Sequence, residues 1–183
     1  NILMPDDGFD GLVIKIASKI KPVLVEKEGG CSIEAEAGVL LGFLVNLAAE
    51  NSLTGMEWAI GVPGTFGGAI RGNAGAMGKD VSLPLRWVEI WRDGETIQLN
   101  PKECAFAYRD SVFKKNNDVI LRGSIFLEKG DKQTIMSQMQ TYLTQRKQTP
   151  FPSSGSFFKN VKLNKWPGDV NELPEQFRQR GTV

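Results

Sequence analysis

The stretch that most restricts the fold is GVPGTFGGAIRGNAGAMG, residues 61–78, which holds seven of the chain's 20 glycines. Glycine adopts backbone conformations that other residues avoid, and it lacks the side chain that would keep a ligand away from the backbone. Successive bare amide groups form concave anion sites, as phosphate-binding loops do. The stretch therefore predicts either a backbone cradle for a ligand or a tight structural loop with close packing.

Two parts of this stretch suit different parts of a ligand. The glycines at its start, with one φ angle set by Pro63, suit a pyrophosphate, whereas Asn73 to Gly75 would bring the backbone close to a flat ring. No Gly-Lys-Ser/Thr ends the stretch, so it is not a Walker motif. It is also not a clean G-x-G-x-x-G that opens a βαβ unit.

Composition limits the class of partner. The chain has 183 residues with 41% hydrophobic composition, enough for a real core and for one domain, or one domain plus part of a second. Lys and Arg number 22 against 21 acidic residues, so no net field attracts nucleic acid or an anionic membrane. We expect neither of those partners.

The chain contains no histidine. This absence excludes Ser-His-Asp hydrolysis within the chain and removes the commonest transition-metal ligand, so no metal site is expected. Cys31 and Cys104 lie far apart and form no C-x-x-C motif, which is typical of free thiols in a reducing compartment. The longest apolar run, residues 39–49, is too short to span a bilayer, and we expect a cytoplasmic protein.

Hydrophobic spacing and turn residues predict an α+β fold. A helix is expected over 39–50, with Asn51 as its stop, and a second helix is expected from a cap at Asp131 to Lys147. The expected strands are 12–16, 23–26, 32–35, two runs within 87–99 joined by Asp93-Gly94, and 119–127 broken at Gly123.

We expect three parts in the chain. Residues 1–130 form the main domain, 131–148 a connecting helix, and 149–183 the start of a smaller α+β domain, with Thr149 to Pro152 at the boundary. The chain begins at Asn1 and stops at Val183 after a turn-like approach to a further strand, so we expect a fragment of a longer protein.

Two further motifs carry candidate chemistry. Tyr108, Arg109, Asp110 and Ser111 lie between apolar anchors, and the Arg109 guanidinium could hold a carboxylate or a developing enolate. The alternative is a surface turn. Ser156 follows Gly155 and precedes two aromatic residues, which fits a proton donor or hydrogen-bonding group, since no histidine is present to activate a nucleophile. The alternative there is a helix-capping serine.

Together these motifs resemble the UDP-N-acetylenolpyruvoylglucosamine reductase family over nearly the whole chain. Gly61 to Ala69 with Asn73 to Ala76 is similar to its second flavin-binding segment, and Tyr108 to Ser111 and Gly155 to Asn160 are similar to motifs specific to it. Only 47 positions separate Arg109 from Ser156, as in the compact, second branch of the family.

The resemblance implies an FAD-binding domain of the FAD-linked oxidase (PCMH/VAO-like) type, followed by the start of a substrate-binding domain. It implies that NADPH reduces FAD and that the reduced flavin passes hydride to the enolpyruvyl group of a nucleotide-sugar substrate. The product would be UDP-N-acetylmuramate, which is used to make peptidoglycan. The enzyme is expected to be monomeric. By the same resemblance Arg109 and Ser156 are catalytic, and Tyr108 and Asn160 bind substrate. The implied cofactor-binding residues are Asn1, Gly61, Val62, Pro63, Gly64, Thr65, Gly67, Gly68, Asn73, Ala74 and Gly75.

The family's third catalytic residue, a glutamate, would lie beyond Val183, and the first phosphate-loop glycines would precede Asn1, so we expect the fragment by itself to be inactive. Two alternatives stay open. One is an FAD-linked oxidase or dehydrogenase of an alcohol, hydroxy acid or sugar, and the other is a non-catalytic flavin-binding module.

Overall fold

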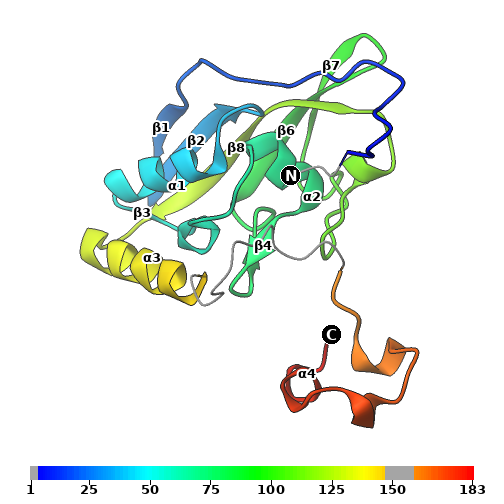
Figure 1. The fold of residues 1–183 in the computed structure, drawn as a ribbon. Coiled ribbons are helices and arrows are strands. Elements are labelled where there is room, and N and C mark those ends of the chain that lie inside the picture. Colours follow the sequence, from blue (N-terminus) through cyan, green and yellow to red (C-terminus); the bar gives the residue numbers. More distant parts are fainter. Residues whose placement is uncertain (1–3, 147–158) are drawn as a thin grey trace. The chain divides into compact units, whose positions relative to one another are not determined.

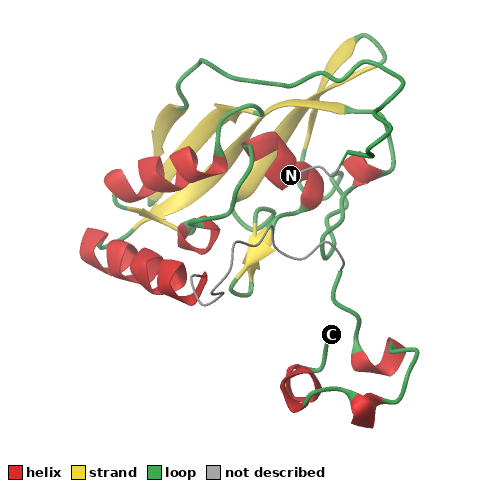
Figure 2. Ribbon diagram, in the orientation of Figure 1, coloured by secondary structure: helices red, strands yellow, loops and turns green. Residues whose placement is uncertain are grey.

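The computed structural model describes residues 4–146 and 159–183. The chain divides into two compact units, Asn1–Gln148 and Thr149–Val183. Both helices and strands contribute to the first unit, as Figure 2 shows, which confirms the predicted α+β class.

The first unit is built on a six-stranded antiparallel sheet (Figure 1). The order is β1-β2-β8-β6-β7, with β3 paired to the end of β8. The strands are β1 (Val23–Lys27), β2 (Gly30–Glu36), β3 (Leu53–Thr54), β6 (Leu85–Arg92), β7 (Glu95–Leu99) and β8 (Val119–Lys129). The central strand β8 follows β7 after about twenty residues of chain, and that connection carries the Tyr108–Ser111 motif.

Helices α1, α2 and α3 lie on one face of this sheet (Figure 1). The helical elements of the first unit are α1 (Leu41–Glu50), η1 (Glu57–Ala59), α2 (Phe66–Gly72), η2 (Val112–Lys114) and α3 (Lys132–Arg146). A small hairpin, β4 (Gly75–Ala76) and β5 (Lys79–Asp80), follows α2. Buried aliphatic and aromatic side chains between helices and sheet form the core.

Gly123 does not break its strand, contrary to the expectation from the sequence. The strand β8 runs without interruption through this residue, which pairs with Ala35 on one side and Val88 on the other. A Cβ at position 123 would lie 3.3 Å from atoms of both Phe66 and Ile70. The glycine therefore lets α2 pack directly against the central strand.

Most of the local expectations are confirmed. Helix α1 ends at Asn51, whose Nδ2 donates to the Leu47 carbonyl at 2.8 Å. The Asp93-Gly94 turn has positive φ at both residues, 50° and 92°, as the two-residue hairpin turn requires. Asp131 caps α3 by accepting from the Thr134 amide at 2.8 Å.

The strand expected over 12–16 is wrong. These residues have no regular secondary structure, and Leu12 and Ile14 are 83% and 74% exposed. A strand needs neighbouring backbone to bond with, and no strand of the described residues pairs with this segment.

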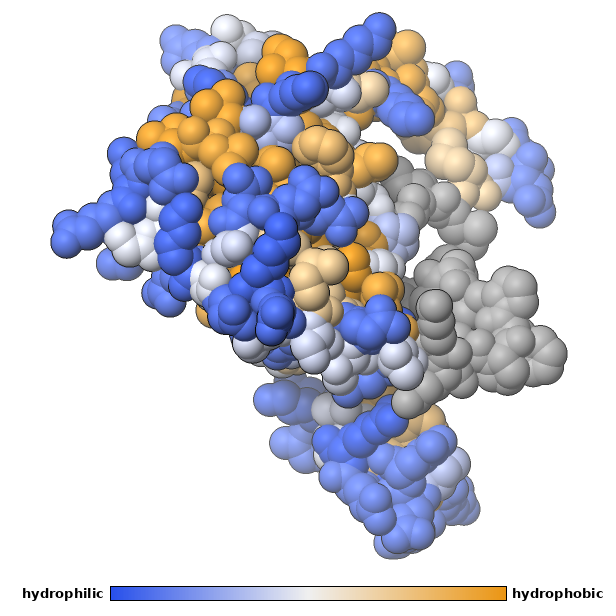
Figure 3. All heavy atoms as spheres, turned by 90° about the vertical axis from the view of Figure 1, so that its left-hand side faces the viewer, coloured by the Kyte–Doolittle hydropathy of each residue, from blue (hydrophilic) through white to orange (hydrophobic). Residues whose placement is uncertain are grey.

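Separate groups of hydrophobic residues also reach the surface among hydrophilic ones on the face drawn in Figure 3.

The second unit contains short elements with no buried residue in them. They are η3 (Leu163–Lys165), η4 (Val170–Glu172) and α4 (Glu175–Arg180). Asp169 caps η4 by accepting from the Asn171 amide at 2.8 Å. An isolated bridge joins Lys162 to Thr182, after Gly181 ends α4 with φ of 72°.

Candidate functional site

The glycine-rich stretch starts as the loop between η1 and α2. Gly61 and Gly64 have φ of 72° and 119°, conformations in which a Cβ is strained. Thr65 then caps α2, because its Oγ1 accepts from the Gly68 amide at 3.2 Å. The first two glycines are therefore required by the backbone path.

Several amides of this loop are bonded within the protein. The Phe66 and Gly67 amides donate to the carbonyls of Val39 and Ala37, at 2.8 and 2.9 Å, and the Val62 amide donates to the Ala59 carbonyl at 3.0 Å. An anion bound here would have to use the remaining amides, such as those of Gly64 and Thr65. Fewer backbone amides are therefore available to an anion than the number of glycines suggests.

Gly67 and Gly68 differ in their surroundings. A Cβ on Gly67 would lie 2.6 Å from the Cβ of Ala37, so this glycine allows α2 to pack against the chain that follows β2. Gly68 is exposed, and a Cβ there would meet only the Thr65 hydroxyl, at 3.4 Å. Of the two, Gly68 leaves bare backbone on the surface.

The end of α2 brings the second part of the stretch into place. Asn73 ends the helix in the left-handed conformation, with φ of 42°, and its Nδ2 donates to the Ala107 carbonyl at 2.9 Å. Its Oδ1 is buried and has no hydrogen-bond partner within the described residues. The partly buried Ala74 donates its amide to the Ala69 carbonyl at 2.8 Å, which leads the chain into the β4–β5 hairpin.

Tyr108 and Arg109 form the tip of a tight turn. The Ala107 and Asp110 backbones bond to each other at 3.0 and 3.1 Å, and Arg109 has φ of 54°. The turn is tied down by Ser111, which is fully buried and donates its hydroxyl to the Arg71 carbonyl at 2.6 Å. Asp110 pairs with Lys115 at 3.1 Å.

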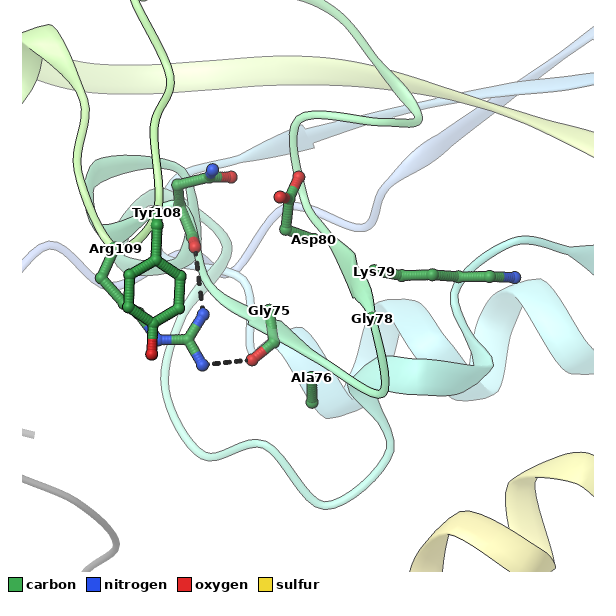
Figure 4. A pocket seen from close by; sticks show the side chains of 8 residues that line it. Gly75, Ala76, Gly78, Lys79, Asp80, Tyr108 and Arg109 are labelled. Atoms are coloured by element: carbon green, nitrogen blue, oxygen red, sulfur yellow. Dashed lines mark hydrogen bonds between the residues drawn. The ribbon is translucent and has the colours of Figure 1, made fainter. Parts of the chain in front are cut away.

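The guanidinium of Arg109 lies against the Asn73–Gly75 backbone. Its Nη2 donates to the Gly75 carbonyl, and its Nη1 lies 3.5 Å from the Asn73 carbonyl (Figure 4). The guanidinium carbon is 5.4 Å from the centre of the Tyr108 ring, within cation–π range. Two of the five guanidinium N–H groups are used in this way, so donors are left for an anion.

These groups line an open pocket of about 250 Å³ (Figure 4). Its lining consists of Asn73, Gly75, Ala76, Gly78, Lys79, Asp80, Tyr108 and Arg109. The structure therefore joins two motifs that lie more than thirty residues apart. It offers a cation, bare backbone and one buried acceptor in the same place.

The other predicted site residues lie elsewhere. Residues 61–68 do not line this pocket. One of them, Val62, is partly buried and packs against the core. Asn160 is exposed in the second unit. Asn1 and Ser156 lie outside the described residues.

The sequence reasoning did not single out the hairpin residues of the pocket. Lys79 and Asp80 line it because Met77 and Gly78, with φ of 53° and 75°, reverse the chain. Asp80 accepts from the Ser82 amide and hydroxyl, at 3.1 and 2.5 Å, which holds the end of the hairpin. The available signal was the residue pair Met77-Gly78, which occupies the position of a two-residue turn.

Neither a metal-binding cluster nor a membrane-spanning helix is present in residues 4–146 and 159–183, the part of the chain that the structure describes. No group of three or more Cys, Asp or Glu side chains there is arranged to hold a metal ion. No helix in those ranges has both the length and the apolar character needed to cross a bilayer.

The comparisons with known proteins agree on one kind of relative. A UDP-N-acetylenolpyruvoylglucosamine reductase of Rubrobacter xylanophilus is 37% identical over 175 residues, which cover 94% of this chain and 58% of that protein. The reductase of Carboxydothermus hydrogenoformans is 40% identical over 164 residues, covering 87% of this chain and 53% of that protein. The chain thus spans just over half the length of these relatives.

A solved structure is also similar. The crystal structure of the UDP-N-acetylenolpyruvylglucosamine reductase of Thermus caldophilus matches with a TM-score of 0.66 and 30% identity, over 86% of this chain and 55% of that one. The family model described as the FAD binding domain matches residues 1–99. The chain therefore belongs to the FAD binding domain family, and its resemblance to the UDP-N-acetylenolpyruvoylglucosamine reductases is confirmed.

Proposed function

We propose that this chain is part of an NADPH-dependent flavoenzyme that reduces the enolpyruvyl group of UDP-N-acetylglucosamine enolpyruvate to give UDP-N-acetylmuramate. The observation that carries the proposal is the position of Arg109. Its guanidinium lies against the Asn73–Gly75 backbone, in the pocket that the family's second flavin segment helps to form. A nucleotide-sugar substrate follows from the same family resemblance.

The pocket residues fit part of an FAD molecule. An isoalloxazine ring carries both N–H donors and carbonyl acceptors on its edge. The buried Asn73 Oδ1, which lacks a partner in the described part of the chain, would accept from such a donor, and bare backbone at Gly75 would admit a flat ring. The remaining amides near Gly64 would contact the pyrophosphate. The chemistry that FAD supplies when bound is hydride transfer from NADPH to the enolpyruvyl methylene carbon.

Arg109 would stabilise the charge that develops on the substrate. When hydride reaches the methylene carbon, negative charge spreads onto the neighbouring carboxylate as an enolate. A guanidinium held in place by backbone carbonyls does not have to reorganise, and such a donor contributes roughly 10²–10³ in rate. Tyr108, which is 55% exposed beside this cation, would contact the substrate.

Two assignments rest on the resemblance alone. Ser156 would deliver a proton to the carbon next to the carboxylate, a step that suits a hydroxyl only because the enolate is strongly basic. Asn160 would bind substrate. We also propose a monomeric, cytoplasmic enzyme, and the two free cysteines, Cys31 and Cys104, favour such a reducing compartment.

The test uses the complete gene product with bound flavin. NADPH should bleach the flavin absorbance, and the enolpyruvyl substrate should restore it. We expect Arg109→Lys to change the rate of flavin bleaching by NADPH by less than twofold. The same variant should slow the return of flavin absorbance on adding the enolpyruvyl substrate by about 10²-fold, because lysine is a point donor on a flexible stem. Ser156→Ala should behave similarly. Flavin that stays oxidised with NADPH but is reduced by an alcohol or hydroxy acid would contradict the proposal.

A further inference from the structure

We propose that Arg146, the last residue of α3, is a positioning residue that holds the loop from Trp58 to Gly61 for cofactor binding. The inference rests on the proposed function, because that loop leads into the segment we assign to FAD. Neither the glycine motif nor the Tyr108–Ser111 motif includes this arginine.

The stem of Arg146 lies directly on the loop. A Cβ on Gly61 would be 3.2 Å from Arg146 Cδ and 3.4 Å from Leu143 Cδ2. Contacts of 3.0–3.4 Å are tighter than ordinary Cβ packing, so the backbone of Gly61 rests on the last turn of α3. Gly61 thus meets two requirements, the positive φ of 72° and the close approach of this helix.

The guanidinium anchors the other end of the same loop. Arg146 Nη2 donates to the Trp58 carbonyl at 3.0 Å, and the Trp58 residue is fully buried in η1. Two internal bonds link η1 to the loop, Ile60 N to Glu57 O at 3.2 Å and Val62 N to Ala59 O at 3.0 Å. The Arg146 side chain therefore contacts both Trp58 and Gly61, at the two ends of a segment that also has two internal hydrogen bonds.

Glu57 completes this bracing from the start of η1. It is buried, and its carboxylate accepts from the Thr54 hydroxyl at 2.6 Å and from the Gly55 amide at 3.0 Å. Helix α3 is in turn fixed by Ile135 and Met139, which are 3% and 6% exposed in the core. Arg146 is thus the link between a fixed helix and a braced loop.

The arginine is held there against an energetic penalty. Its Nε is buried with no hydrogen-bond partner within the described residues, and burial lowers the pKa of the guanidinium. A buried polar donor without a partner is destabilising, and a methionine stem would pack in the same place without it. What arginine adds over methionine is the hydrogen bond to Trp58, so the geometry of the loop is the property to test.

The experiment measures FAD binding to the apo form of the complete gene product, by quenching of flavin fluorescence. We expect Arg146→Met, which keeps the stem but removes the donors, to raise the Kd for FAD at least tenfold. Arg146→Lys, which has a single donor nitrogen on a shorter side chain, should give a Kd between those of Arg146→Met and wild type. Gly61→Ala should also weaken binding, and in the double variant with Arg146→Met the two fold-changes should not multiply, because both act on one contact.

The matched control is Arg92→Met. Arg92 makes two bonds of 2.7 Å to Asp118 on another part of the first unit, so its loss should lower the Tm of the apo form and leave the Kd for FAD unchanged. A wild-type Kd in Arg146→Met, multiplying fold-changes in the double variant, or an equal loss in Arg92→Met would each overturn the inference. If the wild-type protein does not bind FAD, the proposed function fails instead.

Discussion

The Arg109 guanidinium donates to the Gly75 carbonyl, although the two residues are 34 positions apart, and its Nη1 lies 3.1 Å from where a Gly75 Cβ would be. The same Cβ would come within 2.6 Å of the Lys79 carbonyl. The Asp80 Cβ would lie only 2.7 Å away, and contacts this short with the partner strand can be relieved only if the β4–β5 hairpin shifts, together with the Gly75 carbonyl that the guanidinium bonds. Gly75 therefore sets the position of the proposed catalytic cation.

Replacing Gly75 by alanine should move Arg109 away from the pocket. We expect Gly75→Ala, saturated with FAD, to slow turnover of the enolpyruvyl substrate at least tenfold, about 1.4 kcal/mol in barrier, and to raise the Kd for FAD, because Gly75 also leaves room for the flat ring. Stopped-flow absorbance separates the two half-reactions. The control is Gly72→Ala, where a Cβ meets nothing within 4 Å and where alanine favours the helix. Equal turnover in the two variants would contradict this role of Gly75.

Removing the Ser111 hydroxyl should destabilise the turn that carries Tyr108 and Arg109. Ser111→Ala leaves the Arg71 carbonyl at the end of α2 without this partner, and the lost bond should lower the free energy of unfolding by about 1 kcal/mol. Urea denaturation measures this change. The exposed Ser137 provides the comparison, since Ser137→Ala should change stability by less than about 0.5 kcal/mol. Equal effects at both serines would rule out the capping role.

The Asp118–Arg92 pair should make stability depend on acid pH. The Arg92 hydrogen bond lowers the pKa of Asp118 below its ordinary value of 3.8, and the Asp118 side chain is only 3% exposed. A depressed folded pKa contributes stability that is complete above the unfolded value and is lost as pH falls through the folded value. The free energy of unfolding of wild type should therefore exceed that of Asp118→Asn at pH 7, and this difference should shrink as the pH falls below 3.8.

Urea denaturation at several pH values tests this dependence. The comparison is Glu26→Gln, because the Glu26–Lys129 pair at 3.2 Å is 71% and 52% exposed and should contribute almost nothing. A difference between wild type and Asp118→Asn that stays constant between pH 7 and acid would contradict the assignment.

Cys104 should be unreactive in the folded protein. The residue is fully buried, and burial raises the pKa of its thiol to about 11, with the Glu103 carboxylate adding to the rise. Little thiolate forms near neutral pH, and alkylation requires the thiolate. Iodoacetamide at pH 8 should therefore modify Cys104 only after denaturation, as mapped by peptide mass spectrometry. Rapid modification of the native protein would show that the residue is not buried in solution.

Local interactions in this chain could be predicted from short sequence patterns. The Asp93-Gly94 hairpin and the Asp131 cap depend on residues within a few positions of each other, so pattern and structure agree. The strand expected at 12–16 failed for the opposite reason. An apolar run forms a strand only beside other backbone, and the described residues supply none.

The candidate site was predicted in its parts and not in its arrangement. Asn73, Gly75 and Arg109 were singled out by residue type, and the structure brings them to one pocket. Lys79 and Asp80 were missed, because they reach the pocket through a hairpin whose turn pair, Met77-Gly78, is a weaker signal than Asn-Gly or Asp-Gly. Arg146 was missed because its contacts with Trp58 and Gly61 span more than eighty residues of sequence.

The sequence by itself determined the α+β class, the local caps and turns, and the family, since these depend on residue type and short spacing. Only the tertiary structure decided what each glycine does. Gly67 makes room for Ala37 and Gly123 for α2, whereas Gly75 leaves the backbone open to Arg109. Those roles depend on which distant segment packs against the bare backbone, and packing partners far apart in the chain are not encoded in the spacing of the glycines themselves.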